Sequence, residues 1–193
     1  KAMTRKRFND LSAKESREFA MNELSERVLH NTKTTLQIVK HCSSNKINHV
    51  YHLNIFENEF RINVQKKIKK VFEFGGGYGC MARIFSKINK EIRYTCFDTP
   101  YVSLLQYYYL KHNNLDVGFQ KNNKIFLNSK FENTKEKNDL FLANWSLSET
   151  PIKFRNKFYN KIINSKYILI CFQEKFENIN NLKYFNRLKN KLN

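Results

Sequence analysis

The chain has 193 residues and a mass of 23.2 kDa, enough for one domain with an appendage that buries a hydrophobic core without disulfide support. Its 41% hydrophobic and 15% aromatic residues exclude an intrinsically disordered chain, and no apolar run approaches the roughly 18 residues of a membrane span. The 35 Lys and Arg residues against 17 Asp and Glu give a net charge of +18, which favours a polyanionic partner or reflects a general abundance of Lys, Asn, Ile and Phe.

The beginning of the chain and its cysteines indicate the compartment. The first eight residues lack the apolar stretch and the small-residue cleavage site of a secretory signal. The cysteines share no short spacing, which disfavours a disulfide framework and a zinc knuckle. We therefore expect a cytoplasmic protein without a membrane span, whose four cysteines stay reduced: Cys42, Cys80, Cys96 and Cys171.

Residues 1–68 are predicted to form a helical extension. Ser12 and Glu15 have the spacing of a capping box, in which two side chains satisfy free amide groups at the start of a helix. A second helix is expected over residues 34–41, and residues 50–64 are compatible with a helical stripe of apolar side chains. We expect this extension to pack on the following domain or to cover a pocket. The stripe consists of Tyr51, Ile55, Phe56 and Phe60.

From about residue 70, short apolar runs alternate with helical patterns. Strands that alternate with helices predict a parallel sheet with right-handed crossovers. Residues 69–193 are therefore expected to form an α/β domain. The expected strands cover residues 71–74, 92–97, 124–127, 140–143 and 167–172, and the expected helices cover residues 81–88, 101–112 and 152–163.

Four of the five glycines fall within residues 75–79, between a predicted strand and a predicted helix. Glycine is kept where the backbone must turn tightly or approach a ligand closely. Ligands of open parallel sheets bind at the carboxyl ends of the strands. This loop is therefore the first candidate ligand site, with a tight turn that binds nothing as the alternative.

The residues around the glycines discriminate between nucleotide ligands. A dinucleotide-binding loop has its third glycine where Cys80 stands and usually an apolar residue where Glu73 stands. The Walker pattern fails because no Gly-Lys-Ser/Thr follows. An acid two residues before the first glycine would repel a pyrophosphate but suits a cationic amine. The loop therefore favours S-adenosylmethionine, a nucleoside whose tail carries an ammonium group.

Asp98 and the two prolines support a nucleoside site. Asp98 ends the second predicted strand, nineteen residues after Gly79, where an acid can accept hydrogen bonds from both ribose hydroxyls. That spacing fits NAD equally well, and Asp98 can instead cap the next helix. Pro100 and Pro151 each follow a predicted strand, at a place where proline favours a helix start. Residues 144–149 would then line the cofactor and substrate cleft.

Three segments resemble a known family. Residues 73–83 read EFGGGYGCMAR, residues 97–100 read FDTP with SLLQYY at 103–108, and residues 144–151 read NWSLSETP. Together with NLKYF at residues 181–185, they resemble the sugar O-methyltransferases, which are bacterial class I S-adenosylmethionine-dependent enzymes. The resemblance covers about residues 70–190 and implies a Rossmann-like, three-layer sandwich with a sixth and an antiparallel seventh strand. No pattern for those two strands follows Glu174, so we expect the C-terminal strands to be missing.

The resemblance also implies roles for individual residues. Glu73 would approach the ammonium group of the methionine moiety, Asp98 would hold the ribose, and Thr99 would lie near the adenine. Asn144 and Trp145 would face the transferable methyl group and the acceptor. The loop beneath the cofactor would consist of Gly75, Gly77, Tyr78 and Gly79.

Methyl transfer to oxygen is an in-line displacement at a sulfonium, so the enzyme mostly aligns donor and acceptor. A sugar hydroxyl also needs a base that removes its proton. Glu149, after the fourth main strand, and Glu174, after the fifth, are the candidate bases, although Glu149 can equally serve as a carboxylate at a helix start. His49 and His52 are three residues apart, but no carboxylate or cysteine pattern completes a metal site. We therefore expect no metal.

The expected function is methylation of a hydroxyl group in a sugar or glycan precursor. Methylation of base amino groups is disfavoured because residues 144–147 read NWSL, without the proline of such enzymes. Ribose methylation of RNA is an alternative that the charge of +18 supports, so nucleic acid is an alternative partner rather than the favoured one. A non-catalytic module that binds the cofactor is a further alternative. An NAD-dependent oxidoreductase is disfavoured by Cys80 and Glu73.

Overall fold

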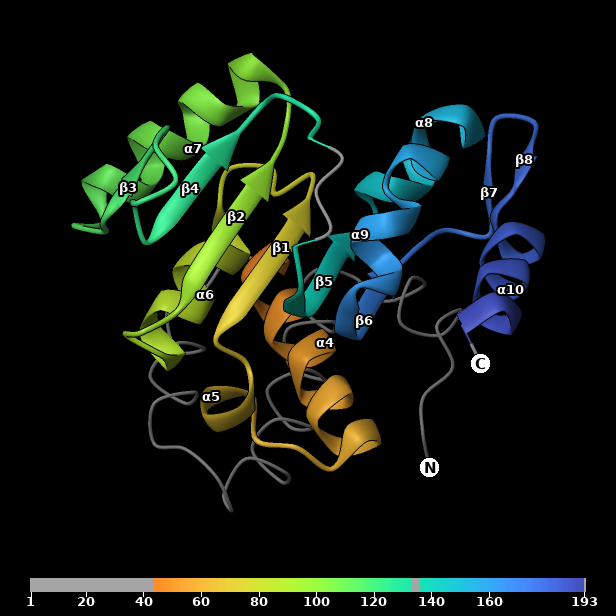
Figure 1. The fold of residues 1–193 in the computed structure, drawn as a ribbon, viewed down its shortest axis with the longest axis horizontal. Helices are drawn as coiled ribbons and strands as arrows, with labels where there is room; N and C mark the ends of the chain where they lie inside the picture. Colours follow the sequence, from red (N-terminus) through yellow and green to blue (C-terminus); the bar gives the residue numbers. More distant parts are fainter. Residues whose placement is uncertain (1–43, 133–135, 193) are drawn as a thin grey trace. The chain divides into compact units, whose positions relative to one another are not determined.

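The computed structural model describes residues 44–132 and 136–192 (Figure 1). The chain divides into two compact units, with the boundary between Val64 and Gln65. The helices predicted within residues 12–41 lie outside the described residues. No helix in the described ranges is long and apolar enough to cross a membrane.

In the first unit, α4 covers Ser44–Phe60. A helix over the ambiguous stretch after residue 50 is confirmed, but the expected stripe is wrong: Phe56 is its only buried member, and Ile55 and Phe60 are 38% and 49% exposed. The helix ends where Arg61 adopts a left-handed conformation with φ of 49°. The buried side chains recur every three residues and form one apolar face: Ile47, Val50, Leu53 and Phe56.

The second unit is built on a six-stranded sheet with strand order β3-β4-β2-β1-β5-β6, in which every neighbouring pair is parallel. Buried parallel strands read as short apolar runs, which is why five strands are observed where they are predicted. β3 was missed because it has two residues, one of them glycine. The strands are β1 (Lys70–Phe74), β2 (Arg93–Phe97), β3 (Val117–Gly118), β4 (Ile125–Asn128), β5 (Asn138–Asn144) and β6 (Ser165–Cys171).

Helices cover both faces of this sheet, so the unit has three layers, and the predicted α/β, Rossmann-like fold class is confirmed. α6 and α7 lie on one face, whereas α8 and α9 lie on the other (Figure 1). The single helix expected over residues 152–163 is divided in two at Phe158, which has φ of −87° and ψ of 0°. The helices are α5 (Val64–Lys67), α6 (Cys80–Ile88), α7 (Pro100–His112), α8 (Ile152–Lys157), α9 (Tyr159–Ile163) and α10 (Asn181–Leu192), with a 3₁₀ turn η1 (Ser146–Glu149).

Both prolines act as predicted, because Pro100 is the first residue of α7 and Pro151 directly precedes α8. After β6, the chain forms a short antiparallel hairpin from β7 (Lys175–Phe176) and β8 (Ile179–Asn180), followed by α10. This hairpin is a sheet of its own and does not extend the six-stranded sheet.

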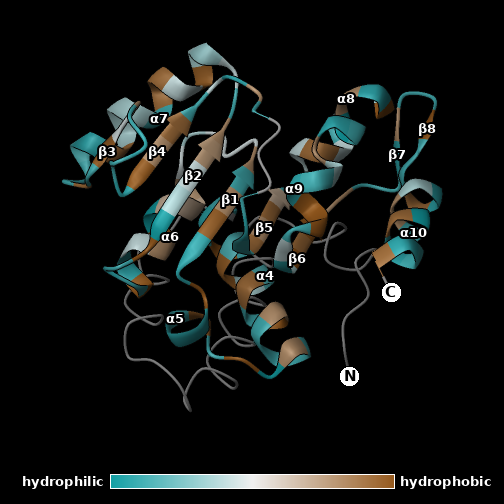
Figure 2. Ribbon diagram, in the orientation of Figure 1, coloured by the Kyte–Doolittle hydropathy of each residue, from teal (hydrophilic) through white to brown (hydrophobic). Residues whose placement is uncertain are grey.

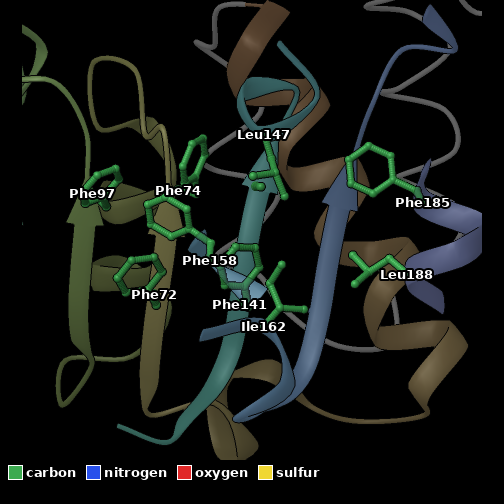
Figure 3. Close-up of a cluster of buried hydrophobic side chains, with 10 residues drawn as sticks. Phe72, Phe74, Phe97, Phe141, Leu147, Phe158, Ile162, Phe185 and Leu188 are labelled. Carbon is green, nitrogen blue, oxygen red and sulfur yellow. The ribbon is translucent and has the colours of Figure 1, made fainter. Parts of the chain in front are cut away.

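The core beneath α8 and α9 is aromatic. Phe72 and Phe74 point to one face of β1, and the alternate residues of this strand point to the face that carries α6. Phe158 is fully buried, with its ring centroid 4.7 Å from that of Phe74 and 4.8 Å from that of Phe97. Figure 3 shows this ring over the strands, and Figure 2 shows hydrophobic residues concentrated along β4, β5 and β6. Burial of aromatic rings therefore fastens α8 and α9 to the sheet.

Replacement of Phe158 by alanine is expected to destabilise the second unit by about 4 kcal/mol, because the cavity would open among stacked rings. Urea denaturation followed by tryptophan fluorescence measures this loss. Tyr101→Ala is the control, since that side chain is 84% exposed and its removal should change the free energy of unfolding by less than about 0.5 kcal/mol. Equal effects of the two substitutions would contradict the assigned core.

Candidate functional site

Three neighbouring strands bring the predicted residues to one edge of the sheet. β1 pairs in parallel with β2 on one side and with β5 on the other. The glycine loop follows β1, Asp98 follows β2, and Asn144 ends β5. Because parallel strands end at the same edge, these three features lie on neighbouring strand ends, where ligands of such sheets bind.

The glycine loop turns sharply between β1 and α6. The N–H of Gly75 donates to the carbonyl of Phe97 at 2.8 Å, and its φ of 70° disfavours any side chain. A Cβ at Gly75 would also collide with Ser146, whose hydroxyl donates to the carbonyl of Phe74. Gly77 has φ of 54°, is exposed, and has nothing within 4 Å of the place where a Cβ would stand. The loop therefore presents open backbone at Gly77.

Gln106 of α7 joins the glycine loop to Asp98. Its Nε2 donates to the carbonyl of Gly77 at 2.9 Å and to Oδ2 of Asp98 at 3.1 Å, while Oδ1 of Asp98 accepts from the N–H of Thr99 at 2.8 Å. Burial raises the pKa of Asp98 above its usual value, and hydrogen bonds to the carboxylate oppose this rise. Asp98 is half-buried and Thr99 is exposed. The carboxylate is thus held against the loop, which suits both a ribose-binding acid and a group that rigidifies the start of α7.

Glu73 lies beneath the loop and is 2% exposed. Its Oε2 accepts from the hydroxyl of Tyr94 at 2.9 Å and from Sγ of Cys96 at 3.7 Å, and a Cβ on Gly76 would stand 2.7 Å from the same oxygen. Burial raises the pKa of Glu73 to about 7; the hydrogen bond from Tyr94 opposes the rise and the charge of Asp98 adds to it. Near neutral pH the carboxyl group is therefore divided between its neutral and charged forms.

The end of β5 carries an unsatisfied amide and a strained residue. Both polar side-chain atoms of Asn144 are buried, and neither has a hydrogen-bond partner within the described part of the chain. Buried polar groups without partners are rare in folded proteins and mark places where a ligand or water binds. Trp145 has φ of 68°, which is strained for a residue with a bulky side chain, and its N–H donates to the carbonyl of Cys171 at 2.8 Å. Strain of this kind is concentrated at functional sites.

Arg155 holds the segment that follows β5. Its guanidinium is fully buried and donates to the carbonyls of Ser148 and Thr150 and to Oδ1 of Asn181, each at 2.6 Å. Asn181, at the start of α10, in turn donates to the carbonyl of Gln173 at 2.9 Å. Burial lowers the pKa of Arg155 from its usual value. These bonds fix η1 and the residues after β6 as one rigid patch.

The two candidate bases lie at this patch. Gln173 accepts from the hydroxyl of Ser148 at 2.8 Å and donates to Oε1 of Glu149 at 3.3 Å. Glu174 is the next residue, and its carbonyl accepts from the N–H of Asn181 at 2.9 Å. The structure therefore brings Glu149 close to the segment that carries Glu174, and both side chains are exposed.

Tyr78 points toward α7 rather than along the strand edge. Its ring packs edge-on against that of Tyr109 at 4.9 Å, and Arg83 donates to the hydroxyl of Tyr109 at 2.8 Å. Across residues 44–132 and 136–192, no group of three His, Cys, Asp or Glu side chains could hold a metal ion.

Several residues of the site were missed from the sequence. Gln106 left a signal, because it is a polar residue on the buried face that α7 presents with Ser103 and Leu110. The pairing of Arg155 with Asn181 left none, since they are 26 residues apart and meet only in the fold. The missed residues are Gln106, Arg155, Gln173 and Asn181.

Comparisons with known proteins give structural likeness only. No family model and no curated protein matches the chain. Among solved structures, mitomycin 7-O-methyltransferase MmcR is 12% identical, covers 94% of this chain and 57% of its own, and has a TM-score of 0.46. Coclaurine N-methyltransferase bound to N-methylheliamine and SAH is 11% identical, covers 79% and 56%, and has a TM-score of 0.45. The StiE O-methyltransferase domain is 16% identical, covers 69% and 47%, and has a TM-score of 0.47. The chain spans about half the length of these proteins.

The position of Glu73 predicts a pH-dependent stability. Below pH 4.5 the carboxyl group is protonated in both the folded and the unfolded chain; as the pH rises to about 7, the unfolded chain releases the proton first, and stability falls. Glu73→Gln should therefore be more stable than the parent by roughly 3 kcal/mol at pH 8, with little difference at pH 4. Urea unfolding of both proteins across this pH range measures the difference. A difference that does not vary with pH would contradict the raised pKa of Glu73.

Proposed function

We propose that the chain binds S-adenosylmethionine at the carboxyl ends of β1, β2 and β5 and transfers its methyl group to an oxygen atom. This proposal rests on the two hydrogen bonds that Gln106 donates, to Gly77 and to Asp98. They hold a strand-end acid beside exposed glycine backbone. Exposed backbone lets a nucleoside approach closely, and the acid can accept from ribose hydroxyls. Thr99, the residue after Asp98, is a proposed cofactor contact, whereas the ring of Tyr78 packs on Tyr109 of α7 and is left out of the proposed site.

The charge of the loop favours a cationic cofactor over a pyrophosphate. Residues 73–80 contain Glu73 and no Lys or Arg, and Asp98 adds a second carboxyl group. Two acids near one loop repel phosphates, whereas the sulfonium and ammonium groups of S-adenosylmethionine are attracted. In this proposal Glu73 acts from beneath the loop, and the bound cation would favour its charged form.

The proposed acceptor site lies beside the end of β5. The amide of Asn144 would gain its missing partners from the cofactor or the acceptor, and Trp145, the next residue, is the proposed aromatic contact of a sugar ring. Glu149, held by Gln173, is the proposed base that takes the hydroxyl proton, and Glu174 is the second candidate. The resemblance to sugar O-methyltransferases supports a hydroxyl of a sugar or glycan precursor as acceptor. The buried, unbridged thiols of Cys80 and Cys96 fit a reducing compartment such as the cytoplasm.

RNA is the second candidate acceptor, supported by the net charge of +18. A module that binds the cofactor without turnover is distinguished from both by the absence of methyl transfer to any acceptor.

Titration calorimetry with S-adenosylhomocysteine tests the cofactor site. We expect the parent to bind S-adenosylhomocysteine with micromolar affinity and not to bind NADH. The affinity of Asp98→Ala for S-adenosylhomocysteine should be at least tenfold lower, because the ribose hydroxyls lose a charged acceptor. Glu91→Gln is the matched control, since this exposed acid lies at the opposite edge of the sheet, just before β2. A folded parent protein that does not bind S-adenosylhomocysteine would refute the proposal.

Methyl transfer from radiolabelled S-adenosylmethionine to a panel of sugars and to RNA tests the acceptor site. Glu149→Gln should lower kcat by about 100-fold or more and leave the affinity for S-adenosylhomocysteine unchanged, because a base acts in the reaction step. The ratio of the parent and variant rates should shrink as the pH rises, since hydroxide replaces the missing base. An unchanged kcat would exclude Glu149, and the same measurement on Glu174→Gln would then test the second candidate.

A further inference from the structure

The described residues of the second unit leave one face of the six-stranded sheet incompletely covered. Thr95 of β2 is paired in register with Phe72 of β1 and Phe126 of β4, so the three side chains lie on the same face. Phe158 covers Phe72, but Thr95 and Phe126 stay half-buried. The described residues between β4 and β5 contain no helix, and Phe131 in this connection is 37% exposed.

A cavity of 390 Å³ lies over this uncovered face. Its aromatic floor includes Phe126 and Phe131, and the ring of Phe131 packs edge-on against that of Phe158 at 5.0 Å. The cavity extends from the amino ends of β1 and β2 to Asn128, at the carboxyl end of β4. Its volume is within the range of pockets that hold small ligands, and it admits a unit the size of one nucleotide.

Cations surround this cavity in excess of acids. The described residues that line it include six cations, Lys70, Arg93, Lys121, Lys124, Lys130 and Lys161, and two acids. Glu136 is paired with Lys70 at 2.6 Å, and Glu132 with Lys121 at 2.8 Å.

Two further cations of the lining donate to backbone carbonyls rather than to carboxylates. Arg93 donates to the carbonyl of Asn122, and Lys124 to that of Lys90, each at 3.0 Å. A carbonyl oxygen orients a cationic group but leaves its charge in place. Lys161 is 6% exposed, with Nζ 5.5 Å from the ring centroid of Phe72; burial lowers its pKa, and the charges of Glu136 and Glu132 oppose this decrease.

We propose that this cavity and the cations around it form a groove that binds a single-stranded nucleic acid. One base would stack on Phe126 and Phe131 in the cavity, and the phosphates on either side would bind the cations around it. A charged groove with aromatic side chains on its floor is the usual way in which proteins bind single strands. This inference does not depend on the proposed methyl transfer, although the groove ends beside the candidate site, where the N–H of Asp98 donates to the carbonyl of Asn128 at 3.2 Å.

Fluorescence anisotropy with labelled oligouridine or oligothymidine of about ten nucleotides tests the groove. The substitution Lys124→Glu combined with Lys130→Glu should weaken binding of the strand at least tenfold and reduce the slope of log affinity against log salt by about 1 to 2, because two phosphate contacts are lost. Lys87→Glu is the control: it is also a Lys→Glu substitution, but Lys87 lies on α6, on the other face of the sheet. This variant should bind the strand less than twofold more weakly than the parent. If both variant proteins lose affinity for the strand to the same extent, the attraction depends on the total charge rather than on this groove, and the proposal is wrong.

Phe126→Leu tests the aromatic floor separately. We expect about tenfold weaker binding with an unchanged salt slope, because stacking is lost and the charges remain. Lys124→Gln with Lys130→Gln replaces the charge-reversed protein if the latter does not fold, as judged by its circular dichroism. No binding by the parent at about 50 mM salt, or binding of uridine monophosphate as tight as that of the strand, would overturn the proposal. S-adenosylhomocysteine affinity measured on the same proteins reports the cofactor site independently of the groove.

Discussion

The parallel pairing of β1 with β2 and β5 is the constraint on which the rest of the site depends. Hydrogen bonding in this register aligns Phe74 with Phe97 and Glu73 with Leu142, so the three strands end together. A slip of one residue would turn Glu73 toward the aromatic core and Phe74 toward α6. The strand ends, the glycine loop and the segment after β5 therefore keep their mutual positions only while the two faces of β1 stay distinct. Phe158 and its neighbouring rings enforce this distinction on one face, and the Glu73–Tyr94 bond does so on the other.

Two carboxyl groups near the glycine loop differ in their surroundings. Glu73 is almost entirely enclosed, whereas Asp98 is half-buried and accepts from Thr99 and Gln106. Burial disfavours the charge on both, but hydrogen bonds offset more of this cost for Asp98. The environment thus prepares Asp98 to accept hydrogen bonds from a ligand and keeps Glu73 close to the point where it gains or loses a proton. A charged Glu73 next to a charged Asp98 costs free energy, and we therefore expect a bound cation above this loop.

The sequence was sufficient for the features that depend on local patterns. Apolar runs located the strands from β1 to β6 except for the two-residue β3, and the clustered glycines located the turn at the ligand edge. Features that depend on distant partners were out of reach. The division of residues 152–163 at Phe158 follows from packing of that ring onto β1, β2 and the loop after β4. The Arg155–Asn181 bond joins segments that no periodicity relates. Likewise, nothing in the pattern EFGGGYG indicates that the acid lies under the loop rather than beside its open backbone.

Charge shows the same contrast between sequence and fold. Along the chain the basic residues are dispersed in short clusters, and a net charge of +18 alone does not distinguish a binding surface from a solvated exterior. In the fold, residues from the starts of β1 and β2 and from the loops around β4 converge on one cavity. Lys70 and Lys121 are paired with acids there, whereas Arg93 and Lys124 donate to backbone carbonyls. Retaining uncompensated charge at an aromatic surface costs stability, because like charges repel and the rings stay partly hydrated. A polyanion with flat bases reduces the repulsion between the cations and also removes water from the rings. A neutral sugar cannot reduce the repulsion. The cavity and the candidate site meet where the N–H of Asp98 donates to the carbonyl of Asn128, so a strand bound at the one would end beside the other.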